Sequence, residues 1–459
     1  MLKNLRIRNF KGWSDTGEIK MSPITLFFGT NSSGKSSIGQ FLMMLKQTAE
    51  SQDRKAVFFP GNDKSPVELG SFKEMVFQRN PKNKISFKYD WSFTPALNFK
   101  DPNGENTYEG EQLGFEAEIS LDATNQQTLS VEKFKYTFGT TLSVEMQKVP
   151  EKKLEYKVDA YGYNLVKKIQ RQWPIKAPYK FYAFPEEAIA YHQNADFVQE
   201  LTLQHEKLFR SIFYLGPFRT KALRLYSWSG MEPESVGNVG ENTVPSILAA
   251  KRRKIGLGYK IPVKAFQEII AQKLKDMGLI DEFKVEPISD KRQEYDVKVR
   301  SRGSKDFVDL PDVGFGVSQV LPVLVQCFYA PPNSIIIMEQ PEIHLHPSAQ
   351  AALADVLIEV IKSKQDGKDR NIQLIIETHS EHFLRRLQRR IAEDTISRDK
   401  VSAYFANTST YPTKLEQLEI DLFGNIQNWP EHFFGDDAGD IAGQAKAAIK
   451  KRISLSNQK

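Results

Sequence analysis

The stretch Gly29–Ser37 constrains the fold more than any other part of this chain, because its sequence GTNSSGKSS fits the pattern G-x-x-x-x-G-K-[ST]. A β-branched and aromatic run, Ile24–Phe28, precedes it, and apolar residues follow at helical spacing between residues 38 and 45. A buried strand, a glycine loop and a helix together form a common phosphate-binding arrangement, with backbone N–H groups at the helix N-terminus. The sequence therefore predicts a nucleotide-binding P-loop.

The residue types of this loop predict its contacts with a nucleotide. Gly29 and Gly34 would let backbone N–H groups close on the β-phosphate. Lys35 would lie between the β- and γ-phosphates, and the Ser36 hydroxyl would ligate Mg²⁺. The other predicted contacts to ATP come from the rest of the loop: Asn31, Ser32, Ser33 and Ser37.

Composition limits the class of protein. At 459 residues, with 40% hydrophobic and 26% charged residues, the chain resembles a globular protein of two or three domains. No apolar run approaches the roughly 18 residues that cross a bilayer. The only cysteine is Cys327, which excludes an internal disulfide framework. We expect a cytoplasmic protein, and its net charge of +6 allows an anionic partner without requiring one.

A second group of motifs lies in the C-terminal half. The apolar run Ile335–Met338 predicts a buried strand, and the sequence EQPE at its end has the form of a Walker B motif. Glu339 is the expected acid on the Mg²⁺ side. A further buried strand over residues 372–376 leads to His379, which is placed to hydrogen-bond a γ-phosphate. Because strands and helices alternate here, we expect a parallel sheet.

A glycine-rich turn precedes one of these predicted helices and contains Gly314, Gly316 and Ser318, followed by Gln319. Such a turn can form a second anion-binding nest at a helix N-terminus, or Ser318 can be a simple N-cap. A single nucleotide does not need two nests in one chain. The second nest has a use if it meets the γ-phosphate bound by another copy.

Other charged and polar runs carry weaker signals. Between the P-loop helix and residue 160 apolar and polar residues alternate, which predicts an antiparallel sheet with one solvated face.

Of three basic runs, 251–254, 385–390 and 446–452, only the first is interpreted as a candidate phosphate-contacting run. His344 and His346 are close in sequence, but no cysteine or acidic triplet completes a zinc site.

Taken in order, the P-loop, the glycine-serine turn, the Walker B strand and Thr378-His379-Ser380 resemble the ATP-binding-cassette head of SMC and OLD-type AAA ATPases. The motifs are most similar to a bacterial group with a long insertion after the P-loop and a Walker B reading Glu-Gln-Pro-Glu-(Ile/Leu)-His-Leu-His-Pro. A small C-terminal domain completes that group. The matching stretches are 31–37, 215–219, 314–322, 339–347, 378–380, 422–425 and 428–434.

The resemblance implies an α/β fold, an ABC-type P-loop ATPase head with a mixed sheet, built from residues 1–84 and 306–400. It implies an insertion over 85–305, β-rich and then helical, and a small C-terminal domain over 401–459. It further implies a homodimer or higher oligomer, in which ATP lies between the P-loop of one copy and the Gly314–Ser318 turn of another. His379 would be the switch histidine, and Gln78 would complete the Mg²⁺ shell.

One residue departs from the wider cassette family, in which a glutamate after the Mg²⁺ acid polarises the attacking water. Here that position is Gln340. An amide orients water but takes no proton, and general-base catalysis is worth about 10²–10⁴-fold. Glu342 is the nearest substitute, although it can equally be a turn residue. We therefore expect a slow ATPase, with a non-hydrolysing scaffold as an alternative.

The biological partner is inferred by analogy alone. The sequence after His379 contains no Asp-x-Asp set for a nuclease, so we expect any effector activity in a separate protein. Similar bacterial ATPases pair with a nuclease or toxin in anti-phage defence, as in Septu- or PARIS-type systems, with nucleic acid or a phage component as a possible trigger. The ATPase of a membrane transporter is another alternative, but its insertion would normally be helical.

Overall fold

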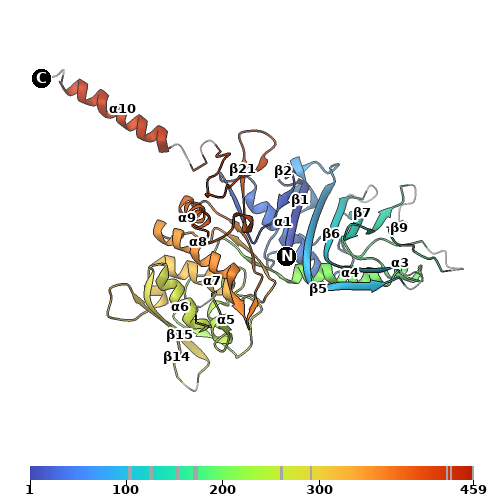
Figure 1. Ribbon diagram of the computed structural model, residues 1–459, viewed down its shortest axis with the longest axis horizontal. Helices are drawn as coiled ribbons and strands as arrows, with labels where there is room; N and C mark the ends of the chain where they lie inside the picture. Colours follow the sequence, from blue (N-terminus) through green and yellow to red (C-terminus); the bar gives the residue numbers. More distant parts are fainter. Residues whose placement is uncertain are drawn as a thin grey trace.

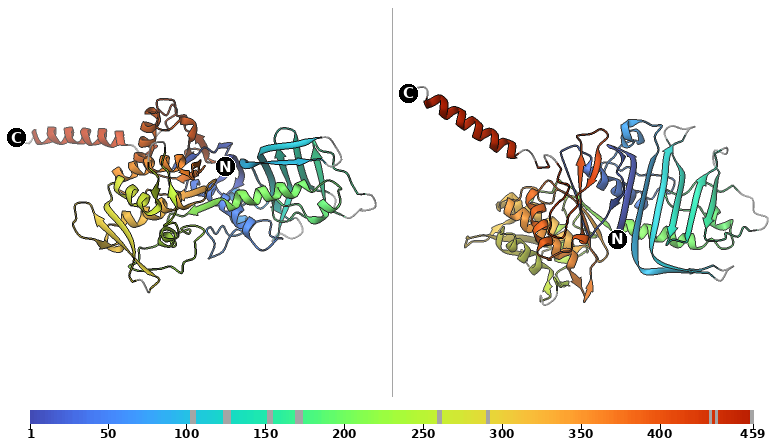
Figure 2. Two further views of the ribbon diagram at one scale, coloured as in Figure 1. Left: turned by 60° about the horizontal axis from the view of Figure 1, so that its bottom comes forward. Right: turned by 45° about the horizontal axis from the view of Figure 1, so that its top comes forward.

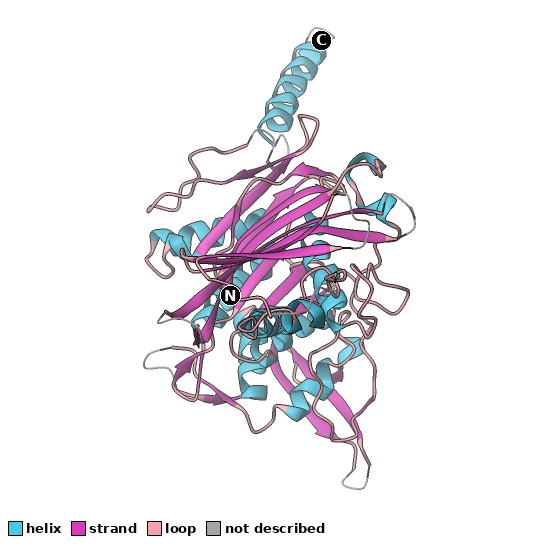
Figure 3. Cartoon of the chain, turned by 90° about the vertical axis from the view of Figure 1, so that its right-hand side faces the viewer, coloured by secondary structure: helices cyan, strands magenta, loops and turns pink. Residues whose placement is uncertain are grey.

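The computed structural model describes residues 1–101, 106–122, 128–150, 155–168, 174–258, 262–289, 292–430, 433–434 and 437–456. Two large sheets form the body, and the C-terminal helix α10 (Asp437–Ser456) projects away from it (Figures 1 and 2). The strands cross the middle of the molecule, with a helix-rich part beside them (Figure 3). No helix in the described ranges combines the length and the apolar character needed to cross a membrane.

The central sheet carries the sequence motifs and has the strand order β10-β17-β20-β4-β21-β22. All neighbouring pairs are parallel except the last, which is antiparallel. The parallel sheet expected from the alternation of strands and helices is thus confirmed. The strands are β4 (Ile24–Gly29), β10 (Ile212–Leu215), β17 (Ile335–Glu339), β20 (Gln373–Glu377), β21 (Val401–Asn407) and β22 (Lys414–Gln417).

The central strands read as continuous apolar runs because both of their faces are buried. Ile335 and Ile337 pack into one core together with the larger sheet, whereas Ile336 and Met338 pack into a second core on the opposite face. The first face is covered by α1 (Lys35–Glu50) and α4 (Phe197–Arg210), and the second by α6 (Phe266–Asp276), α7 (Phe315–Tyr329), α8 (Pro347–Lys362) and α9 (Glu381–Ala392).

The larger sheet combines the N-terminus with the insertion. Strand β1 pairs antiparallel with β5, so the insertion strands extend a sheet that the first residues begin. The alternating residues thus form the antiparallel sheet predicted for them. The strands are β1 (Leu2–Phe10), β2 (Trp13–Asp15), β3 (Ile19–Lys20), β5 (Ile85–Lys100), β6 (Thr107–Leu121), β7 (Leu129–Phe138), β8 (Leu142–Lys148) and β9 (Tyr156–Tyr161).

Shorter elements complete the described chain. The helical ones are α2 (Phe72–Met75), α3 (Glu186–Ala190), α5 (Thr243–Ala249) and the 3₁₀ turns Phe77–Arg79, Leu310–Asp312 and Arg398–Lys400. A small antiparallel sheet beside α6 contains β11 (Tyr226–Ser227), β14 (Ile280–Pro287), β15 (Glu294–Ser301) and β16 (Val308–Asp309). Two short ribbons pair β12 (Lys254–Ile255) with β13 (Lys264–Ala265), and β18 (Lys364–Gln365) with β19 (Lys368–Asp369).

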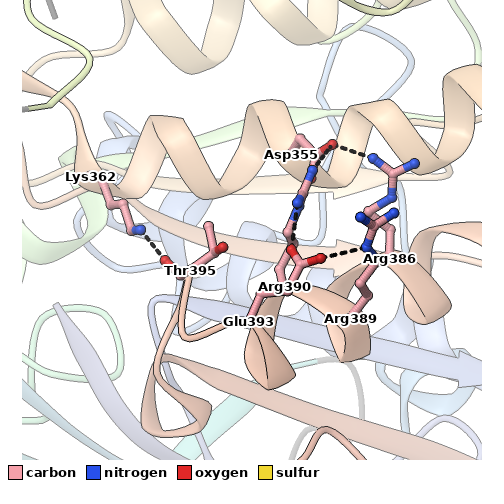
Figure 4. A network of polar contacts seen from close by, with 7 residues as sticks. All are labelled: Asp355, Lys362, Arg386, Arg389, Arg390, Glu393 and Thr395. Atoms are coloured by element: carbon pink, nitrogen blue, oxygen red, sulfur yellow. Dashed lines mark hydrogen bonds and ion pairs between the residues drawn. The ribbon is translucent and has the colours of Figure 1, made fainter.

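A charged network on the surface joins α8 to α9 (Figure 4). The Asp355 carboxylate on α8 accepts hydrogen bonds from Arg386 at 2.5 Å and from Arg390 at 2.6 Å, both on α9. Arg390 also bonds Glu393, which pairs with Arg389. We call the set Asp355, Arg386, Arg390 and Glu393 the helix clamp. The second basic run of the sequence therefore has a structural role in holding two helices together.

The C-terminal segment packs against the strand that leads into the P-loop. The rings of Phe433 and Phe434 lie 5.3 and 6.1 Å from the ring of Phe28, and Trp429 stacks on the guanidinium of Arg385 at 4.5 Å. Within the predicted C-terminal stretch 428–434, residues 431 and 432 lie outside the described ranges. These contacts tie the C-terminal segment to β4, a strand of the central sheet, and to α9, which covers one face of that sheet.

Candidate nucleotide site

The P-loop begins where β4 ends, and two of its glycines have conformations that other residues rarely adopt. Gly29 has φ 145°, and a Cβ there would lie 2.9 Å from the Ala406 carbonyl oxygen on β21. Gly34 has φ 91° and lies against the Trp13 indole, which donates to the Gly34 carbonyl at 3.1 Å. Both positions require glycine because the backbone passes so close to its neighbours. The first turn of α1, Lys35-Ser36-Ser37-Ile38, contains no acid, as suits a helix N-terminus that receives an anion.

Lys35 lies folded back into its own loop. Its ammonium donates to the carbonyl oxygens of Gly29 at 3.0 Å and Thr30 at 2.7 Å, and to Ser33 Oγ at 3.3 Å. The side chain is 3% exposed, and burial lowers its pKa while the nearby Glu377 charge opposes that shift. The ammonium of Lys35 is therefore held by backbone oxygens of its own loop. Phosphate oxygens can replace these partners when a nucleotide binds.

Two carboxylates meet beside this lysine at the ends of neighbouring strands. Glu339 ends β17 and Glu377 ends β20, and the two residues are direct partners in the parallel register. Glu339 accepts a hydrogen bond from the Tyr214 hydroxyl at 2.8 Å, and Glu377 lies 4.0 Å from Lys35 Nζ. We call Lys35, Ser36, Glu339 and Glu377 the strand-end cluster.

Burial dominates the electrostatics of this cluster. It raises the pKa of Glu339 to about 7, and the neighbouring Glu377 charge adds to the rise. It also raises the pKa of Glu377, against the opposing effects of the Ser36 hydroxyl and the Lys35 charge. The two acids therefore lie beside a lysine that already has other partners, and the charge of Arg219 offsets only part of the effect of burial on Glu339.

The glycine-serine turn lies at the N-terminus of α7. The helix begins at Phe315, inside the stretch predicted as a turn, so Ser318 belongs to the helix and is not its N-cap. Ser318 Oγ donates to the Phe315 carbonyl at 2.8 Å. The Phe315 ring is 53% exposed and packs edge-on against His344, 4.9 Å between centroids. The turn thus faces solvent while it contacts the loop that follows Walker B.

Comparison with known proteins agrees with this arrangement. Residues 1–208 and 260–384 match the family described as AAA ATPase domain. The chain belongs to this family. Residues 396–444 match a family described as a protein of unknown function (DUF3696), and no curated protein matches the chain. The predicted fold class, a P-loop ATPase head with a mixed sheet and a small C-terminal domain, is confirmed.

Solved structures similar to this AAA-family chain include heads of SMC proteins. The SMC head domain from Thermotoga maritima is 10% identical, with 91% of this chain and 99% of that chain covered and a TM-score of 0.40. The SmcHead bound to the C-winged helix domain of ScpA is 10% identical, with 91% and 98% covered and a TM-score of 0.39. The Smc head domain derived from Pyrococcus furiosus, with an extended coiled coil and bound to the C-terminal domain of ScpA, is 9% identical, with 91% and 96% covered and a TM-score of 0.41.

The AAA-family site has a donor set suited to Mg²⁺. Ser36, Glu339 and Glu377 offer hydroxyl and carboxylate oxygens, and Mg²⁺ in nucleotide sites typically takes one or two carboxylates, phosphate oxygens and water. Within the described residues no group of three or more His, Cys, Asp or Glu gathers, as a metal site made of protein ligands alone would require. His344 packs on Phe315, and His346 caps α8 through Ser348, so both histidines have structural partners.

The residues after Glu339 form a tight loop. Gln340 has φ 46°, a left-handed conformation for a non-glycine residue, and its N–H donates to the Glu377 carbonyl at 2.8 Å. Such strain is found often at functional sites. The buried Glu342 carboxylate accepts from Thr378 Oγ1 at 2.7 Å and from the His379 N–H at 2.8 Å. Glu342 therefore fixes the turn that carries His379.

His379 and Gln78, the two other predicted site residues, are both exposed, and their roles at the site stay predictions. Partial burial lowers the pKa of the His379 imidazole, and the charge of Lys35 lowers it further. Gln78 is exposed at φ 58°, and its amide donates to the Tyr411 hydroxyl at 3.0 Å. None of the contacts between described residues joins Gln78 to Ser36 or Glu339.

Sequence reasoning missed Glu377, Tyr214 and Arg219 as site residues. Glu377 lies inside the run that predicted His379, and the only signal was an acid closing an apolar strand. Arg219 donates to the Glu339 carbonyl at 3.3 Å, and its Nε and one terminal nitrogen are buried with no hydrogen-bond partner among the residues described. Burial lowers the pKa of Arg219 to about 10.

The first basic run, proposed to contact phosphate, is partly committed to the fold. Arg253 donates to the Tyr329 carbonyl at 2.9 Å and pairs with Glu232. Its neighbours Lys251, Arg252 and Lys254 are exposed. The third run lies on α10, where Lys446, Lys450 and Lys451 are exposed, and the side chain of Arg452 lies outside the described residues.

Proposed function

We propose that this chain is a slow ATPase whose copies associate through ATP, and that this association controls a separate effector protein. ATP would lie between the P-loop of one copy and the Gly314–Ser318 turn of another. The observation that supports the proposal is the strand-end cluster beside the P-loop together with a glycine-serine turn that faces solvent at the N-terminus of α7. An exposed nest beside an exposed aromatic ring, Phe315, is suited to a partner surface.

The roles in the site follow from the contacts. Lys35 and the first turn of α1 would bind the phosphates, and Ser36 and Glu339 would hold Mg²⁺. His379, whose backbone N–H is held by Glu342, would donate a hydrogen bond to the γ-phosphate from the turn after β20. Gln340 would orient the attacking water without accepting its proton, which supports slow turnover.

Association is tested by analytical ultracentrifugation with and without Mg²⁺ and a non-hydrolysable ATP analogue. We expect the mass of the wild type to rise with the analogue. Ser318→Arg is expected to stay at the mass of one copy and to keep its affinity for the analogue. Ser348→Arg, at the exposed N-terminus of α8, is the matched control. If the wild type had the same mass with and without the analogue, ATP-driven association would be refuted.

Turnover is tested by phosphate release. Gln340→Glu restores an acid at the position after Glu339, and we expect a rate at least about tenfold above that of the wild type. Equal rates for the wild type and Lys35→Ala would favour a non-hydrolysing ATP-dependent scaffold. An unchanged rate in Gln340→Glu, together with real wild-type turnover, would remove Gln340 as the cause of slow hydrolysis.

The effector is proposed from the resemblance of residues 339–347, 422–425 and 428–434 to bacterial ATPases that act with a nuclease or toxin in anti-phage defence. The test is co-expression with the product of the neighbouring reading frame, followed by capture of the tagged ATPase with and without ATP. We expect capture that depends on ATP and on Lys35. Loss of phage protection in Lys35→Ala would support a defence role, and unchanged protection would contradict it.

A further inference from the structure

The Glu377 carboxylate occupies a position that its fold contacts alone do not explain. It ends β20, the strand between β17 and the P-loop strand β4, so it lies between the Walker B acid and the P-loop. Its side chain is 10% exposed, and one oxygen is 4.0 Å from Lys35 Nζ. The other oxygen, Oε2, is buried and has no hydrogen-bond partner among the described residues.

The neighbours of Glu377 increase the need for a cation. Glu339, its register partner, is a second buried carboxylate. Lys35 is already bonded to two carbonyl oxygens and a hydroxyl of its own loop, and phosphate would compete for it further. Arg219 offsets part of the effect of burial at Glu339, but burying two like charges beside a lysine that already has other partners is costly. A divalent ion between the acids would relieve that cost.

The oxygen ligands available here match one kind of ion. We propose that Glu377 is a second carboxylate ligand of the Mg²⁺ that accompanies ATP, beside Ser36 and Glu339. Glu377 interacts with the Ser36 hydroxyl and lies 4.0 Å from Lys35 Nζ, whereas Gln78, expected in that shell from the resemblance, donates to Tyr411 on the surface. This inference rests on the proposed ATP site, because the phosphates supply the remaining ligands.

The experiment measures how strongly Mg²⁺ and nucleotide help each other to bind. The affinity of the full-length protein for a fluorescent, non-hydrolysable ATP analogue is titrated in Mg²⁺ and again in EDTA. The dissociation constant in EDTA is divided by the dissociation constant in Mg²⁺. This ratio is compared for the wild type, Glu377→Gln, Glu339→Gln and a control, Glu416→Gln. Glu416 is a carboxylate at the far edge of the same sheet, bonded to Asn407.

We expect Glu377→Gln to lower the ratio by at least about tenfold, as Glu339→Gln does, since even outer-shell partners of metal ligands are worth about 10–100-fold in metal affinity. Affinity in EDTA should stay equal or rise, because a negative charge near the phosphates is gone. Glu416→Gln should match the wild type.

Two outcomes would overturn the inference. A Glu377→Gln ratio equal to that of the wild type would show that Glu377 does not hold the metal. An equal loss of affinity in Mg²⁺ and in EDTA would make Glu377 an anchor of Lys35 alone. A wild type that binds no nucleotide in either condition would instead refute the proposed function itself, so the two failures are distinguishable.

Discussion

The strand-end cluster and the helix clamp both contain acidic and basic side chains, but they differ in burial and in how completely their charges are paired. In the helix clamp, each acid faces arginines at hydrogen-bond distance, and the four side chains are 25–36% exposed (Figure 4). In the strand-end cluster, Lys35 and Glu377 are 3% and 10% exposed, two acids are register partners, and a carboxylate oxygen lacks a partner. Solvated, fully paired charges stabilise a fold, whereas buried, unmatched charges destabilise it until a ligand arrives.

The largest difference is expected in nucleotide binding. Lys35→Ala should weaken binding of an ATP analogue about 10–100-fold, because it removes a charge-assisted contact to phosphate. Lys46→Ala, on the same helix but paired with Glu50, is the control and should bind as the wild type does. Fluorescence titration measures both. Equal affinities would place the nucleotide elsewhere than the P-loop.

The next effect concerns stability in the helix clamp. Asp355→Asn keeps the shape of the side chain but removes the charge that two arginines share. We expect a loss of about 1–2 kcal/mol in the free energy of unfolding, reduced from a fully buried pair by solvent. Denaturant unfolding measures it. Stability equal to that of the wild type would mean that packing alone joins α8 to α9.

The same chemical change should act in the opposite direction in the strand-end cluster. Glu339→Gln removes a buried charge beside Glu377 and keeps an oxygen for the Tyr214 hydroxyl. We expect the nucleotide-free protein to be as stable as the wild type or more stable by up to about 1 kcal/mol. A destabilisation like that of Asp355→Asn would erase the distinction between the two clusters.

The smallest effect on the free energy of unfolding should come from Arg389, which lies beside the helix clamp. Arg389 is 62% exposed and pairs with Glu393 outside the contacts to Asp355. Because exposed ion pairs contribute little, Arg389→Ala should unfold at the same denaturant concentration as the wild type. A clear loss would show that the network is cooperative beyond its direct contacts to α8.

Local patterns predicted the parts of the site that are contiguous in sequence. Residues 29–37 specified a strand, a glycine loop and a helix, and Ile335–Met338 specified a buried strand ending in Glu339. The two glycines Gly314 and Gly316 predict a turn, although α7 begins at Phe315 and includes Gly316. Glycine has a low helix propensity, but close packing favours it at this helical position. A Cβ at Gly316 would lie 3.0 Å from the His344 carbonyl oxygen.

Strand neighbours that are distant in sequence were beyond the reach of such patterns. Nothing in the local sequence showed that β1 pairs with β5, or that β21 lies beside β4 and brings the C-terminal aromatic residues onto Phe28. Glu377 was read as part of a strand, and its partnership with Glu339 came only from the register of β17 and β20.

By itself, then, the sequence determined which segments become strands and helices and which loop binds phosphate, because periodicity and glycine positions act within a few residues. Only the tertiary structure decided which acids share a site, which arginines are structural and which carboxylate oxygen lacks a partner. Those properties depend on strand order, register and burial, and residues hundreds of positions apart set them together.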